Sequence, residues 1–239
     1  MAKWGRKGAA LCLCIGFCLL APVGRAAADP IGLDRQVASL QAAAPSLDPE
    51  VLRLALIARA SAEREGLLNR PQILTVIDYR LPSTKPRLWV LDLERQALLH
   101  HELVAHGRGT GENYAKAFSN RDGSLQSSLG LFATAGTYQG KQGYSLYLQG
   151  LEPGVNDLAL QRTIVMHGAS YVSESFARLH GRLGRSWGCP ALRPEISRQV
   201  IDHIKGGTAL FVYYPDQKWL ASSEFLDTPA TAGSSVAAR

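Results

Sequence analysis

The heptapeptide GRSWGCP, at residues 184–190, holds a cysteine, Cys189, between a glycine and a proline. A thiolate is a strong nucleophile, but a free thiol has a pKa of about 8.5 and is mostly protonated near neutral pH. The best candidate for a base that activates it is His167 in IVMHGAS, which ends an expected strand. Gly168 follows and allows close backbone approach. A cysteine thiol combined with a histidine imidazole predicts nucleophilic catalysis, with Cys189 as the nucleophile and His167 as its base.

The neighbours of Cys189 favour the same chemistry. Arg185 and Arg193 add positive potential, which favours a thiolate. The backbone of Gly188 and Cys189 offers amide hydrogens for an oxyanion. A structural interpretation stays open, because a lone cysteine is often a small buried hydrophobe and a lone strand-end histidine is often structural.

The first 28 residues have the three parts of a secretory signal peptide. Three basic residues precede an apolar run at 9–23, and small residues in GRAAADP follow. The run is shorter than the roughly 20 residues that a transmembrane helix needs. We therefore expect cleavage after Ala28, no stable membrane anchor afterwards, and export to the periplasm or cell-wall space; a retained anchor is the competing interpretation.

Cleavage changes the cysteine and charge counts. Three of the four cysteines lie in residues 1–28, so the mature chain keeps Cys189 alone and forms no internal disulfide. An unpaired cysteine in an exported protein indicates intermolecular pairing or a reactive thiol. Four of the 26 basic residues also leave, so 22 stand against 20 acidic ones, a net charge of +2. Without a long basic run, we expect no nucleic-acid partner.

The remaining chain predicts a mostly β fold with a few helices. Residues 29–72 form an expected N-terminal helical extension, in which Asp48 caps a helix that begins at Pro49. Residues 73–217 form the expected catalytic domain, and residues 218–239 an expected disordered tail. Within that domain the patterns indicate strands at 73–79, 87–93, 97–105, 128–134, 144–149, 163–166 and 208–214, a glycine-rich loop at 135–143 and a helix within 193–207.

Two short motifs together carry a family resemblance. A histidine-glycine pair, His167–Gly168, precedes the SWGC motif of residues 186–189 by a spacer of 17 residues. This arrangement resembles the L,D-transpeptidase family with its YkuD-type catalytic domain, and FSNRDGSLQSSLGLFAT and GRLGRSWGCPAL look closest to a distinct branch of it. The resemblance implies a β-sandwich-like catalytic domain that acts on peptidoglycan stem peptides without a cofactor.

The resemblance also implies roles. Cys189 would attack a stem tetrapeptide, His167 would transfer protons, and the Gly168 carbonyl would orient the histidine. Ser186, Trp187 and Gly188 would form the oxyanion and positioning elements, and carbapenem-type β-lactams would be possible inhibitors. Arg185, Arg193 and Tyr171 are the expected substrate-binding residues.

This sequence departs from the family pattern at two positions. Trp187 replaces the second histidine, and an indole cannot titrate. Ala191 stands where the family has arginine, with Arg193 the nearest substitute.

Three functions remain open. The first is an L,D-transpeptidase, the second an L,D-carboxypeptidase or amide hydrolase on peptidoglycan peptides, and the third a wall-binding module with an inert thiol. We expect no metal, because Cys189, His167 and His180 include no closely spaced ligand pair.

Overall fold

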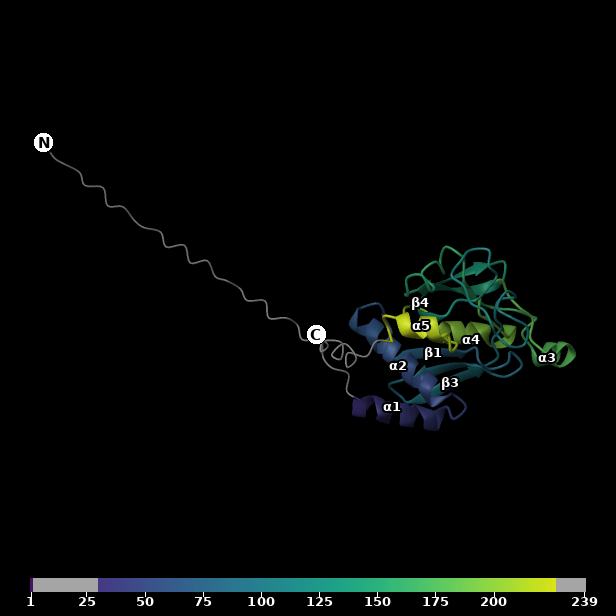
Figure 1. Ribbon diagram of the computed structural model, residues 1–239, viewed down its shortest axis with the longest axis horizontal. Helices are drawn as coiled ribbons and strands as arrows, with labels where there is room; N and C mark the ends of the chain where they lie inside the picture. Colours follow the sequence, from purple (N-terminus) through teal and green to yellow (C-terminus); the bar gives the residue numbers. More distant parts are fainter. Residues whose placement is uncertain (2–29, 227–239) are drawn as a thin grey trace, which may run out of the picture.

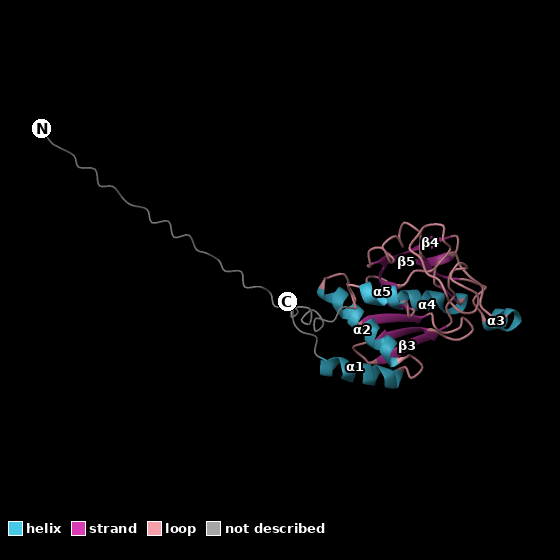
Figure 2. Ribbon diagram, viewed as in Figure 1, coloured by secondary structure: helices cyan, strands magenta, loops and turns pink. Residues whose placement is uncertain are grey.

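The computed structural model describes Met1 and residues 30–226, so the expected signal peptide and residues 227–239 lie outside the described part apart from Met1. Eight strands form one mixed sheet in the order β3-β2-β1-β8-β4-β5-β6-β7. The fold is mainly β with short helices, as the sequence predicted (Figures 1 and 2). In chain order the elements are α1 (Pro30–Ala43), α2 (Pro49–Arg64), β1 (Ile73–Asp78), β2 (Leu88–Asp92), β3 (Ala97–Glu102), β4 (Gly130–Gly140), β5 (Gly143–Gly150), β6 (Val165–Gly168), α3 (Glu174–His180), β7 (Ala191–Leu192), α4 (Pro194–Ile204), β8 (Ala209–Tyr213) and α5 (Gln217–Ser222).

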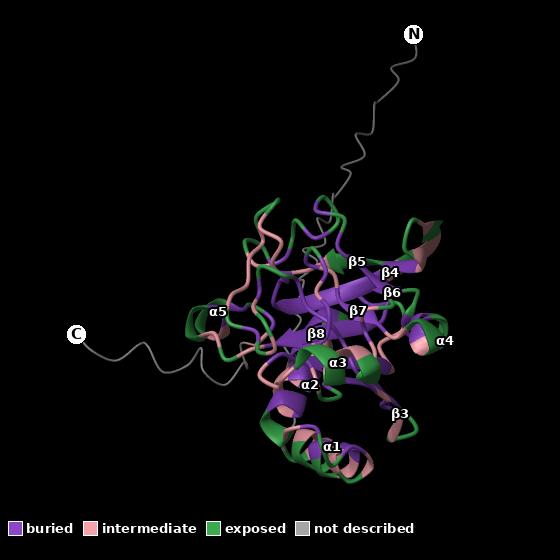
Figure 3. Ribbon diagram, turned by 90° about the vertical axis from the view of Figure 1, so that its right-hand side faces the viewer, coloured by how far each residue is buried: buried purple, intermediate pink, exposed green. Residues whose placement is uncertain are grey.

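The central strands of the sheet form the middle of the hydrophobic core. Every residue of β1, β2 and β8 is buried, as expected for strands that are covered on both faces. β1 pairs in parallel with β8 and antiparallel with β2, and β8 continues antiparallel into β4. Figure 3 shows β8 and β4 as buried strands, with more exposed helices such as α1 and α4 around the sheet.

The N-terminal helices pack on this same core. The Asp48 side chain accepts hydrogen bonds from the amides of Glu50 (2.9 Å) and Val51 (3.2 Å), which caps α2 at its predicted start. The apolar face of α2 packs on β1 and β8. Trp89 of β2 is fully buried, and its indole donates to Ser46 Oγ between α1 and α2 at 3.1 Å. Residues 30–64 are therefore part of one packed unit with the sheet.

α4 packs against β6, the strand that carries His167. Gly168 makes this close packing possible, because a Cβ there would lie 2.7 Å from Ser197 Oγ and 3.3 Å from Pro194 Cα. The absence of a side chain at Gly168, next to the candidate base, therefore lets α4 pack closely against the sheet.

Two segments differ from the sequence expectation. Most of the expected loop at 135–143 is strand, because β4 stays paired with β5 after an irregularity and turns only between Gly140 and Gly143. Helix α5 lies within the expected disordered tail. Its Trp219 is buried and donates to Glu152 Oε2 at 2.9 Å, a long-range contact that orders the segment.

Candidate active site

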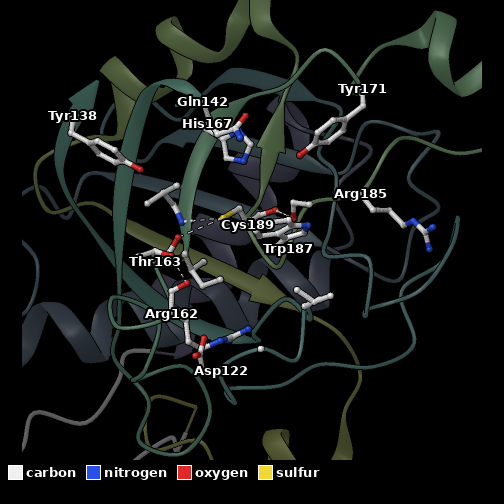
Figure 4. Close-up of a pocket in the computed structure, with 15 residues that line it drawn as sticks. Asp122, Tyr138, Gln142, Arg162, Thr163, His167, Tyr171, Arg185, Trp187 and Cys189 are labelled. Atoms are coloured by element: carbon white, nitrogen blue, oxygen red, sulfur yellow. Dashed lines mark hydrogen bonds between the residues drawn. The ribbon is translucent and has the colours of Figure 1, made fainter. Parts of the chain in front are cut away.

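Cys189 and His167 line the same cavity, which has a volume of about 560 Å³ (Figure 4). His167 comes from β6, and Cys189 comes from the loop that leads into β7. β6 and β7 are paired in parallel, with His167 opposite Ala191. The pairing of these two short strands therefore holds the histidine and the cysteine at one edge of the sheet.

The thiol of Cys189 is bonded to the backbone just before and within β6. Sγ accepts from the Val165 amide at 3.5 Å and donates to the Thr163 carbonyl at 3.7 Å. Burial raises the pKa of the Cys189 thiol, and the Val165 amide and the charge of Arg162 oppose that rise. The thiol is thus mostly protonated at neutral pH and requires a base.

His167 has the tautomer that a base needs. Its Nδ1 lies 2.9 Å from the Gly168 carbonyl, which can only accept, so Nδ1 carries the hydrogen and Nε2 is left with a free lone pair. Burial lowers the pKa of His167, so the ring is neutral near pH 7. A neutral imidazole with an open Nε2 in the cavity of the thiol is chemically suited to accept its proton.

Hydroxyl groups fix the loop that carries Cys189. Ser186 Oγ accepts from the Gly188 amide (3.1 Å) and donates to the Cys189 carbonyl (2.6 Å). From the other side, Ser127 Oγ donates to the Gly188 carbonyl at 2.9 Å. Gly188 has φ = 131°, and a Cβ there would lie 2.8 Å from the Gln126 carbonyl oxygen. Only glycine fits at this point of the loop.

This hydrogen bonding bears on the expected oxyanion donors. The Gly188 amide already donates to Ser186 Oγ, whereas the Cys189 amide faces the thiol of its own residue and has no backbone acceptor within the described part of the chain. The Cys189 amide is therefore the one of these two donors that no other residue holds.

The other sequence-predicted residues fall into two groups. Ser186, Trp187, Tyr171 and Arg185 line the cavity. Trp187 is 75% exposed, and burial raises the pKa of Tyr171 to about 12. Arg185 points away from Cys189 in Figure 4 and forms a 2.5 Å ion pair with Glu112.

Arg193 is not among the residues that line this cavity. Its guanidinium donates twice to Glu102 Oε2, at 2.6 and 3.0 Å. It therefore acts in the structure as an ion-pair partner of β3.

Arg162 lines the cavity although it is not among the site residues predicted from the sequence. Its side chain is 8% exposed and donates to the carbonyls of Ser119 (2.7 Å) and Gln126 (2.6 Å) and to Ser128 Oγ (2.6 Å). Its charge also faces Cys189. No local pattern marks this residue, because its partners lie more than 30 positions upstream.

A second histidine-glycine pair lies at His106–Gly107, in the segment that follows β3. His106 does not line the cavity, and its Nδ1 accepts from the buried Arg87 at 2.8 Å. Burial and the Arg87 charge lower its pKa to about 3. His106 is therefore a neutral partner of a buried arginine.

Among residues 30–226, no group of three or more His, Cys, Asp or Glu side chains is arranged to hold a metal ion. Within the described ranges, no helix has the length and apolar character needed to cross a membrane.

Comparison with known proteins gives a family match. Residues 43–213 match the L,D-transpeptidase catalytic domain family. A search of curated proteins finds no match.

Similar solved structures include an L,D-transpeptidase from Mycobacterium smegmatis, with 13% identity, a TM-score of 0.38, and coverage of 60% of this chain and 59% of that one. Another is L,D-transpeptidase 1 from Mycobacterium tuberculosis, with 13% identity, a TM-score of 0.32, and coverage of 60% and 62%. A third is the helical cell shape determining protein Pgp2 (K307A mutant) from Campylobacter jejuni, with 11% identity, a TM-score of 0.41, and coverage of 69% and 57%. In each case this chain spans less than two thirds of the other chain's length.

Proposed function

Because the chain belongs to the L,D-transpeptidase catalytic domain family, we propose that it is a peptidoglycan L,D-transpeptidase with Cys189 as nucleophile and His167 as general base. The observation that carries this proposal is the shared cavity of the thiol and a neutral imidazole whose Nδ1 is tied to the Gly168 carbonyl. The substrate class is the stem tetrapeptide, by family membership.

In the first half of the reaction, Cys189 Sγ attacks the carbonyl carbon at the L-centre of meso-diaminopimelate. His167 Nε2 accepts the thiol proton and then donates it to the leaving amine, so that D-alanine departs as the C–N bond breaks. The product is a thioester on Cys189. In the second half, an amine of a neighbouring stem, or water, attacks this thioester and releases the thiol.

The pKa directions favour proton transfer during attack over a preformed thiolate–imidazolium pair. Burial raises the pKa of Cys189 and lowers the pKa of His167, so both groups are neutral before substrate binds. The thiol must first turn from the Thr163 carbonyl toward His167. Arg162 then provides the positive charge that stabilises the developing thiolate.

The oxyanion of the tetrahedral intermediate needs donors that do not have to be released first. The Cys189 amide meets this requirement once its own thiol turns to attack, whereas the Gly188 amide is held by Ser186. Ser186 and Gly188 therefore act in this proposal by fixing the loop that aims the Cys189 amide and thiol.

We place the enzyme outside the cytoplasm, in the periplasm or cell-wall space. Family membership supports this location, because peptidoglycan is the substrate of the family. The basic, apolar and small-residue parts of the first 28 residues support it independently.

A muropeptide digest tests the proposal. Purified protein is incubated with tetrapeptide-bearing muropeptides, and products are identified by mass beside a Cys189→Ala control that has the same melting temperature. Cross-linked dimers from the wild type alone support transfer. Tripeptides alone support the hydrolase, and equal products from both proteins would refute the catalytic assignment.

A further inference from the structure

A second hollow, of about 410 Å³, adjoins the Cys189 cavity. Three arginines, Arg108, Arg182 and Arg185, line it together with Tyr171, Phe176 and Gly184. Tyr171 and Arg185 line both hollows. We call the second hollow the arginine groove, and it begins where the Cys189 cavity ends.

Tyr171 forms the wall between the two hollows. Its carbonyl accepts from the Gly184 amide at 2.9 Å, and a Cβ at position 184 would lie 2.3 Å from Tyr171 Cβ. The absence of a side chain at Gly184 therefore lets Tyr171 pack directly on the backbone. In Figure 4 the Tyr171 hydroxyl points toward Cys189, whereas Arg185 extends the other way.

The charges of the arginine groove are only partly compensated. Arg182 Nε and Arg185 Nη1 share one carboxylate, that of Glu112, at 2.8 and 2.5 Å. The side chain of Glu112 is 70% exposed, and exposed ion pairs of this kind are weak and exchangeable. The Arg108 guanidinium has no partner within the part of the chain that the structure describes. Three positive charges against one negative charge leave the groove net positive.

The remaining side chains around the groove do not reverse this balance. On α3, Glu174 pairs with Arg178 at 3.5 Å, so these two charges offset each other. Phe176 packs against the His180 ring at a centroid distance of 4.2 Å and supplies an apolar surface. The groove thus combines the Arg108 guanidinium, two arginines that share the exposed Glu112 carboxylate, and an aromatic wall.

We propose that the arginine groove is a subsite for an anionic acyl acceptor, namely an amine-bearing peptide with free carboxylates. This rests on the proposed function, since a transferase must hold a second substrate beside the thioester. The acceptor amine attacks the thioester carbon, the C–S bond breaks, the C–N bond forms, and the amine proton passes through His167 to the Cys189 thiolate. Arg108 and Arg182 bind the acceptor carboxylates, and the Glu112 carboxylate stays paired with Arg182 and Arg185 until the acceptor displaces it from Arg182.

The kinetic test uses a tetrapeptide donor and an amine-bearing stem peptide acceptor, supplied with its carboxylates either free or amidated. The Arg108→Ala/Arg182→Ala variant should lower the ratio of cross-linked product to tripeptide about tenfold with the free acceptor. It should leave that ratio unchanged with the amidated acceptor. Glu112→Gln should raise the ratio about twofold to threefold, because a competing carboxylate is removed.

Arg95→Ala is the matched control, because Arg95 is an exposed arginine paired with Asp92 beyond β2, outside the arginine groove. It should change neither ratio. An arginine-groove variant with the wild-type ratio for the free acceptor would overturn the subsite, as would an equal loss with the amidated acceptor.

A binding measurement separates the subsite from the proposed function. Calorimetric titration of the free-carboxylate acceptor peptide into the Cys189→Ala protein should give binding that weakens with salt and is lost in the groove variant. If the wild type releases no D-alanine, the proposed function is refuted. The titration still shows whether the acceptor peptide binds at the arginine groove. Absence of binding, or binding that the groove arginines do not affect, refutes the subsite.

Discussion

The chain contains two histidine-glycine pairs, and they lie in contrasting surroundings. His167 ends β6 beside an open cavity, with one ring nitrogen tied to the Gly168 carbonyl and the other free. His106 is 1% exposed, and both of its ring nitrogens have partners, Arg87 at 2.8 Å and the Gly111 carbonyl at 3.3 Å. The same dipeptide therefore supplies a candidate base in one place and a buried structural link in the other.

Their difference lies in unused bonding capacity rather than in burial. Both histidines have a lowered pKa because both are buried. Only His167 keeps a free lone pair that faces a possible substrate. A histidine whose two nitrogens are satisfied stabilises the fold, whereas one with an open nitrogen in a cavity can transfer protons.

The largest expected effect comes from His167→Gln. The substitution removes the base but retains a side chain that can bond to the Gly168 carbonyl. We expect the rate of D-alanine release to fall about 10²- to 10⁴-fold. Chemical denaturation should show little loss of stability, and a near-wild-type rate would remove His167 from the mechanism.

The second effect concerns stability and comes from His106→Phe. The phenyl ring keeps the packing against Tyr79, but Arg87 loses an acceptor while it stays fully buried. We expect the free energy of unfolding to fall by about 1–3 kcal/mol in urea titrations. The specific rate of the folded fraction should remain near that of the wild type, so a loss of catalysis without a loss of stability would contradict the comparison.

The same variant should alter the pH dependence of stability. In the folded chain the pKa of His106 is about 3. Below about pH 6.5 His106 is therefore protonated in the unfolded chain while it stays neutral in the folded chain. This contribution to stability is complete above that pH and is lost as pH falls toward 3, at up to about 1.4 kcal/mol per pH unit. Unfolding free energies measured at pH 7 and pH 5 should therefore differ less in His106→Phe than in the wild type.

The smallest expected effect comes from Trp187→Ala. Because Trp187 is 75% exposed at the cavity, its loss should remove a contact surface for substrate without disturbing the thiol. We expect KM for the tetrapeptide to rise about threefold to tenfold with kcat nearly unchanged. Trp187→Phe is the control that keeps an aromatic surface, and a drop in kcat alone would assign Trp187 to the transition state instead.

The sequence predicts elements that local chemistry determines. The start of α2 follows from Asp48 and Pro49, and the strands from their apolar runs. The outer half of β4 was expected to be a loop because its glycines are turn-formers, yet pairing with β5 keeps it extended. Likewise, α5 lies in a polar, alanine-rich tail, and its order depends on the distant Glu152.

The candidate site likewise contains residues that the sequence reveals and residues that only the tertiary structure reveals. His167 and Cys189 stand out because their types, their glycine neighbours and their spacing are visible in the sequence. Arg162 does not, because its place in the cavity depends on four acceptors in the 119–128 segment. The use of the Gly188 amide by Ser186 depends equally on loop conformation, which residue types alone do not specify.

The most direct test of the central assignment is the rate of acylation of Cys189 by a carbapenem, followed by intact mass. The strained β-lactam carbonyl should form one thioester per protein, and three proteins are compared: wild type, His167→Gln and His106→Phe. The account predicts one adduct at similar rates in the wild type and His106→Phe, with at least about a hundredfold slower acylation in His167→Gln. An unmodified wild type, or His167→Gln acylated as fast as the wild type, would contradict it.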